Sequence, residues 1–194
     1  LTNSLINLDT GNGFFATKGE LFLDNVDVIM ANGTGLRQSG GHTSTISNST
    51  FETKKDAIYS TNAHLVISGS QIATTGDGAS AVTTVNSNAT TTITNSELIA
   101  NGLNSAVLDN SYGASTTLDN VFIRHNGVQG GSLISINAGS ITGTNVNATA
   151  TGNNTNGIFT TYSNGNVALT DSSITVKGAD ASGIAAYGTT AGHK

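Results

Sequence analysis

The sequence predicts an all-β protein that folds as a parallel β-helix of about eight coils, with 21–28 residues in each coil. Three observations lead to this prediction. A short apolar pattern recurs eight times at that spacing, one position of the pattern holds only Asn, Gly or Asp, and a second apolar column follows the first in every repeat. Self-similarity at a period of a few tens of residues is typical of architectures in which each repeat stacks on the next.

Each copy of the pattern reads aliphatic, any residue, then Asn, Gly or Asp, two further residues and a second apolar residue. The copies span residues 1–6, 23–28, 46–51, 67–72, 93–98, 118–123, 141–146 and 169–174. Their third position holds Asn3, Asn25, Asn48, Gly69, Asn95, Asn120, Gly143 and Asp171. These residue types accept a positive φ at the lowest cost, so we expect a left-handed backbone turn at this place in every coil. Stacked Asn side chains can form an amide ladder along the axis.

A second column, usually a small residue before a bulky apolar one, lies 12–17 residues after each copy begins. It holds Gly13-Phe14, Gly35-Leu36, Ala57-Ile58, Ala81-Val82, Ala106-Val107, Leu133-Ile134, Gly157-Ile158 and Gly183-Ile184. The residue after each pair is expected to face outward, which gives the row Phe15, Arg37, Tyr59, Thr83, Leu108, Ser135, Phe159 and Ala185.

Short strands fit this pattern better than helices. Residues on one side of a stretch recur at every second position, as at Ser132, Ile134 and Ile136, and the apolar residues show no helical period of 3.6. A leucine-rich repeat would need a helical half, and none is visible in the sequence. We therefore expect three strands per coil, with each coil bonded to the next at about 4.8 Å.

The composition indicates one domain over residues 1–194. Only 10% of residues are charged, the net charge is -5, and there is neither Pro nor Cys. The absence of Pro suits a continuous ladder of backbone hydrogen bonds, and the absence of Cys excludes disulfides and thiolate metal sites. The seven basic residues form no stripe, so we expect no nucleic-acid partner. The chain begins and ends within a coil, and we expect it to be part of a longer protein.

No catalytic residues and no cofactor are predicted. Enzymes built on β-helices need carboxylates on neighbouring coils, and no outward column stacks two acids on adjacent coils, although acids from different columns could meet across a turn. His42 and His64 stand at similar places in adjacent repeats, but no third metal ligand accompanies them. We predict no metal site there, and none at His125 or His193.

One outward patch is a candidate ligand-binding site. Arg37 and Tyr59 should be stacked neighbours, with Lys54 and Lys55 in the turn before Tyr59. An aromatic ring beside cationic groups can dock a sugar or an anionic glycan. The alternative is an ordinary solvent-exposed surface.

The irregular coils, the stretches Thr92-Ile93-Thr94-Asn95-Ser96 and Leu118-Asp119-Asn120-Val121, the Gly-Ile pairs and the absence of Cys and Pro resemble the passenger domains of autotransporters, of the pertactin-like and AIDA-like adhesins. The resemblance covers the whole chain. It implies a right-handed, three-sided β-helix at the bacterial cell surface or secreted, held to the membrane only through a C-terminal barrel that this chain lacks.

The function expected from this resemblance is non-enzymatic: a cell-surface adhesin or self-association module. Its partner would be a host glycan, an extracellular-matrix protein or another copy of the chain, bound through the side of the β-helix. Two alternatives stay open, a polysaccharide-cleaving or tailspike-like module and a structural spacer.

Overall fold

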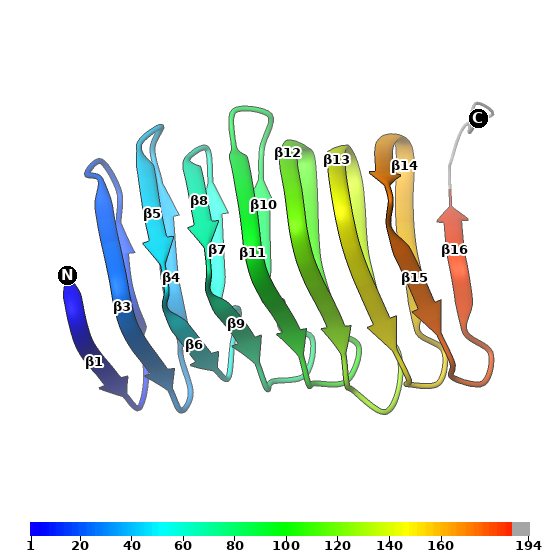
Figure 1. The fold of residues 1–194 in the computed structure, drawn as a ribbon, viewed down its shortest axis with the longest axis horizontal. Helices are drawn as coiled ribbons and strands as arrows, with labels where there is room; N and C mark the ends of the chain where they lie inside the picture. Colours follow the sequence, from blue (N-terminus) through cyan, green and yellow to red (C-terminus); the bar gives the residue numbers. More distant parts are fainter. Residues whose placement is uncertain (188–194) are drawn as a thin grey trace.

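The computed structural model describes the backbone of residues 1–187 and the side chains of these residues except 162–164. Residues 1–187 form a parallel β-helix without α-helices, as predicted, and all the strand pairs are parallel (Figure 1). The strands are β1 (Thr2–Leu8), β2 (Asn12–Ala16), β3 (Leu21–Met30), β4 (Thr34–Ser39), β5 (Thr43–Ser47), β6 (Thr50–Thr53), β7 (Ile58–Thr61), β8 (His64–Ser68), β9 (Gln71–Thr74), β10 (Val82–Val85), β11 (Thr90–Ala100), β12 (Ala106–His125), β13 (Ser132–Ala150), β14 (Asn156–Thr170), β15 (Ser173–Val176) and β16 (Ser182–Tyr187).

The strand register defines three faces, and the longest strands bend around corners to serve more than one. Face 1 contains β5, β8 and the segments of β3, β11, β12, β13 and β14 that align with them. Face 2 follows it in each coil and contains β6, β9, β15 and the aligned ends of β1, β3, β11, β12 and β13. Face 3 contains β2, β4, β7, β10, β16 and the first parts of β12, β13 and β14. Eight rungs on a face are separated by seven steps, so the right-handed helix makes about seven turns at about 4.8 Å per step.

The core is one continuous column inside the three faces. Inward positions carry Leu, Ile, Val and Phe side chains that stack on their equivalents in the next coil; Phe51, for example, aligns with Val28 on one side and Ile72 on the other. All three side chains are at most 1% exposed. Alternation along each strand therefore leaves the outward positions free of packing constraints.

The corner between face 1 and face 2, called the 1/2 corner below, contains the predicted left-handed turn. Its residues have φ between 48° and 57° at Asn3, Asn25, Asn48, Gly69, Asn95, Asn120 and Asp171. Amides bond to each other at two places in this column: Asn25 Nδ2 donates to Asn3 Oδ1 at 2.7 Å, and Asn120 Nδ2 donates to Asn95 Oδ1 at 2.8 Å. The ladder is interrupted at Asn48, whose Nδ2 donates to Asp24 Oδ1 at 2.9 Å instead, and at Gly69, which has no side chain.

Gly143 does not belong to this column, and its assignment was wrong. The turn residue of the seventh coil is Asn145, with φ 53°, whereas Gly143 pairs with Leu169 at an inward position. A Cβ on Gly143 would lie 2.8 Å from Val146 Cγ2 and 2.9 Å from Leu169 Cδ2, so neighbouring side chains occupy its place in the core. Ile141, two residues earlier, also points inward, and the alternation offered two possible starting points.

A serine ladder supports the same corner. Ser49, Ser70 and Ser96 follow their turn residues and are buried. Each hydroxyl accepts a hydrogen bond from a backbone N–H of the preceding coil, from Val26 to Ser49 at 3.0 Å, from Ser49 to Ser70 at 3.1 Å and from Ser70 to Ser96 at 3.1 Å. Each also donates to the carbonyl two residues earlier in its own coil. These bonds satisfy backbone groups that the left-handed turn removes from the β-ladder.

Candidate functional site

The outward row of face 3 carries aromatic, cationic, acidic and small polar side chains in one line. The strand pairings place Phe15, Arg37, Tyr59, Thr83, Asp109, Ser135, Phe159 and Ala185 in line along the axis. Seven of these eight residues agree with the sequence prediction. The fifth is Asp109 rather than Leu108, which is buried in the core.

Arg37 and Tyr59 are stacked neighbours in this row, as predicted. The guanidinium carbon of Arg37 lies 5.1 Å from the centre of the Tyr59 ring. Arg37 is exposed and Tyr59 is half-buried. A guanidinium over an aromatic face is held by the ring quadrupole, so the Tyr59 ring positions Arg37 rather than offering that face to a sugar.

The structure also brings Lys54 and Lys55 to Arg37. All three line a surface pocket of about 340 Å³ together with Thr34, Asp56, Asp77, Gly78 and Ala79. Its carboxylates are engaged with backbone: Asp56 Oδ1 accepts from the Ser80 N–H at 2.8 Å, and Asp77 Oδ1 accepts from the Leu103 N–H at 2.9 Å.

The cations of this pocket have no close carboxylate partner. Within the described part of the chain, the one ion pair closer than 4 Å joins Arg124 to Glu97 on face 2, with 2.7 Å between Nε and Oε1. Arg37, Lys54 and Lys55 therefore form no ion pair within 4 Å, although the carboxylates of Asp56 and Asp77 line the same pocket and the Arg37 charge acts on Asp56. We call the pocket of Arg37, Lys54 and Lys55 the cationic pocket.

Two partly buried carboxylates on this side of the molecule, Asp56 and Asp109, have raised pKa values. Burial raises the pKa of Asp109, and the negative charge of Asp56 raises it further. Burial also raises the pKa of Asp56, while the Ser80 N–H and the Arg37 charge act in the opposite direction. The two residues come from different columns, a corner and a strand, so the search for acids within one column missed them. The one sequence signal was Asp109 directly after the apolar pair Val107-Leu108.

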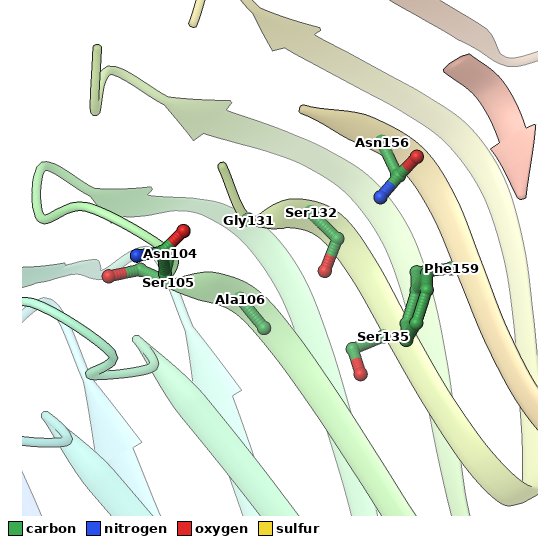
Figure 2. Close-up of a pocket in the computed structure, with 8 residues that line it drawn as sticks. All are labelled: Asn104, Ser105, Ala106, Gly131, Ser132, Ser135, Asn156 and Phe159. Carbon is green, nitrogen blue, oxygen red and sulfur yellow. The ribbon is translucent and has the colours of Figure 1, made fainter. Parts of the chain in front are cut away.

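A second pocket, of about 250 Å³, lies farther along face 3 (Figure 2). Its lining residues are Asn104, Ser105, Ala106, Gly131, Ser132, Ser135, Asn156 and Phe159. The first residues of β12, β13 and β14 are aligned here as Ala106, Ser132 and Asn156, and Phe159 follows Ser135 in the outward row. We call this the Phe159 pocket. The sequence placed Ser135 and Phe159 in the outward row but did not predict the hollow.

The three histidines that the structure describes do not assemble a metal site. His64 Nδ1 lies 2.7 Å from Thr90 Oγ1, and the backbone N–H of His64 donates to the His42 carbonyl. Both ring nitrogens of His42 and of His125 are buried without a hydrogen-bond partner. No group of three or more His, Cys, Asp or Glu among the described residues could hold a metal ion. His193 lies outside these residues.

Among residues 1–187 no helix is long and apolar enough to cross a membrane.

A family model described as NosD, periplasmic copper-binding protein, matches residues 9–192, which is nearly the whole chain. Neither a curated protein nor a solved structure matches the chain significantly. The structure has the parallel β-helix that the autotransporter resemblance implies. No match is specific to autotransporter passengers. By this match and its parallel β-helix, the chain belongs to the NosD family.

Proposed function

We propose that this chain is a non-enzymatic glycan-binding module of the bacterial envelope, and that it binds an acidic glycan through the cationic pocket on face 3. The observation that carries the proposal is the group of three cations without carboxylate partners, one of them held over Tyr59 at 5.1 Å. A guanidinium can bind a carboxylate or sulfate with two parallel hydrogen bonds, and two nearby ammonium groups add attraction.

The row geometry supports a linear ligand. Outward side chains on successive rungs repeat at about 4.8 Å, so a chain molecule lying along the axis meets one side chain per rung. Several weak contacts in line give affinity without a deep cavity.

The family description supports an extracytoplasmic location, in the periplasm. A periplasmic module would meet glycans of the envelope itself. The same face, displayed at the cell surface, would make the protein an adhesin that binds a host glycan, a matrix protein or a second copy of the chain. Concentration-dependent dimers in analytical ultracentrifugation, without added glycan, would favour the self-association form.

Copper, which the family description names, has no role in this proposal. Copper is held by thiolate, thioether and imidazole ligands. The chain has no Cys, its single Met, Met30, is 1% exposed in the core, and the described residues form no three-ligand cluster. The residues that the structure describes therefore do not fit a copper centre.

The test measures binding of acidic oligosaccharides, such as oligogalacturonate or a sulfated oligosaccharide, by isothermal titration calorimetry. Arg37→Ala and the double variant Lys54→Ala/Lys55→Ala should each weaken binding at least tenfold, which corresponds to about 1.4 kcal/mol. Binding should also weaken with rising salt. Arg124→Ala is the matched control, because Arg124 is paired with Glu97 on another face. Equal affinity in the wild type and in both cationic-pocket variants would contradict the proposal.

A second candidate function is polysaccharide cleavage, favoured by one observation. Burial raises the pKa of Asp56 and of Asp109, the charge of Asp56 adds to the shift at Asp109, and a carboxyl of raised pKa can act as a general acid. Release of reducing ends from an acidic polysaccharide, abolished in both Asp56→Asn and Asp109→Asn, would establish this activity in place of simple binding. Asp77→Asn is the control, since Asp77 lines the same pocket.

A further inference from the structure

The Phe159 pocket differs from the cationic pocket in having no charged residue among its lining side chains. Its polar groups are the amides of Asn104 and Asn156 and the hydroxyls of Ser105, Ser132 and Ser135. Within the described residues, no hydrogen bond between protein groups uses the side chain of Ser132 or Asn156. The Ser132 hydroxyl and the Asn156 amide are therefore available to a ligand that both donates and accepts hydrogen bonds, whereas Ser105 bonds to backbone carbonyls and Ser135 to Asp109.

Small residues create the hollow. Ala106, Gly131, Ser132 and Ser135 occupy two adjacent coils without a bulky side chain among them. Gly131 has φ 96°, and a Cβ there would lie 2.2 Å from the Ser105 carbonyl oxygen and 2.5 Å from His125 Nε2. Gly131 thus forms the floor of the pocket, at a position that only glycine can occupy without displacing its neighbours.

Phe159 forms the wall of the pocket. Figure 2 shows its ring with Asn156, Ser132 and Ser135 grouped around it. Away from these residues the ring contacts Tyr187, with 5.6 Å between ring centres and 48° between ring planes, and Tyr187 is 65% exposed. Tyr187 thus packs against the ring on the side away from the pocket. Phe159 presents an apolar surface next to uncharged amides and hydroxyls.

This chemistry matches one class of ligand. A neutral pyranose ring has an apolar C–H face that packs on an aromatic ring and hydroxyls that bond to amides and serines. A volume of about 250 Å³ is small for an organic ligand and suits a single ring. The absence of charged lining residues disfavours a uronate or a sulfated sugar at this place, because neither would find a counter-charge.

We propose that the Phe159 pocket is a neutral-sugar subsite, separate from the cationic pocket and on the same line. Tyr59 and Phe159 are four rungs apart in the outward row, about 19 Å at the spacing of adjacent strands. The two pockets would then bind different sugar units of one extended heteroglycan that lies along the helix axis. This proposal rests on the proposed function only in assuming that the ligand is a glycan.

The test compares neutral oligosaccharides, cello- and chito-hexaose, with oligogalacturonate on the same protein by titration calorimetry. Phe159→Ala and Asn156→Ala should each weaken binding of a neutral hexasaccharide at least tenfold, while Arg37→Ala leaves it within twofold. Phe22→Ala is the matched control, because Phe22 is 59% exposed on face 1 and lines none of the pockets on face 3. Circular dichroism verifies that each variant keeps its strand content.

The outcomes separate the two proposals. Neutral binding that depends on Phe159 and Asn156 supports the subsite even if oligogalacturonate fails to bind, a result that would overturn only the cationic pocket. Acidic binding that depends on Arg37, with no neutral binding or with neutral binding unchanged in Phe159→Ala and Asn156→Ala, overturns the subsite alone. Absence of binding for every glycan overturns both.

Discussion

The 1/2 corner and the outward row of face 3 both recur once in every coil, yet their residues vary to very different degrees. The corner holds six Asn, one Gly and one Asp in eight coils, each with φ near 50°. The outward row holds Phe, Arg, Tyr, Thr, Asp, Ser, Phe and Ala. The corner is constrained because only a few residue types accept a left-handed backbone, whereas an outward strand position accepts any side chain. The difference shows where the fold is specified and where a binding surface can diversify.

The largest difference in unfolding free energy is expected when an inward aromatic residue and an outward one are each truncated to Ala. Phe51→Ala should cost about 3–5 kcal/mol of unfolding free energy, because the Phe51 side chain is 1% exposed and fills the space left by Gly35. Phe22→Ala should change it by no more than about 0.5 kcal/mol. Urea unfolding followed by far-UV circular dichroism measures both. Equal losses would mean that the outward positions also support the fold.

The left-handed turn can be probed apart from its amide ladder. Asn120→Ala should cost about 1–2 kcal/mol, because Ala pays the steric penalty at φ 54° that Asn and Gly avoid. Asn126→Ala is the control: Asn126 Nδ2 also donates to an amide of the preceding coil, Asn101 Oδ1, at 2.9 Å, but without a positive φ. Asn120→Gly should lie between the two. If the changes at 120 and 126 cost the same, the hydrogen bond rather than the turn determines the residue.

The smallest expected effect is a pH dependence under the Phe159 pocket. Burial lowers the pKa of His125 below its ordinary value of 6.5. The unfolded chain therefore takes up a proton below pH 6.5 that the folded chain resists, and stability falls as the pH drops from about 6.5 towards the folded pKa, by at most about 1.4 kcal/mol per pH unit. Above pH 6.5 this contribution is constant.

His125→Leu should remove that slope, measured as the difference in unfolding free energy between variant and wild type at pH 5, 6 and 7. Asp56 and Asp109 have raised pKa values and act with the opposite sign, favouring the folded state as the pH falls, but they are present in both proteins and cancel in the difference. Parallel pH profiles would show that His125 ionises equally well in the folded protein.

Sequence reasoning succeeded where one residue determines its own conformation. Asn at a left-handed position is recognisable without its neighbours, and so is an apolar residue that recurs at a fixed distance from it. It failed at Gly143 and Leu108, where two apolar or small residues compete for one inward position. Packing made those choices: Leu169 and Val146 fill the space beside Gly143, and the strand pairing Val82 to Leu108 sets the register of the fifth coil.

Local chemistry in the sequence thus determined the β-helix, its apolar interior, the 1/2 corner and the pairing of Arg37 with Tyr59. Only the tertiary structure decided that the charge of Asp56 acts on Asp109, that the turn of Asp77 and Gly78 joins Arg37, Lys54 and Lys55 around one pocket, and that Phe159 lines a hollow together with Asn156. The physical reason is that corners of unequal length shift the register between coils. Which side chains meet across neighbouring coils therefore depends on backbone hydrogen bonding between segments more than twenty residues apart.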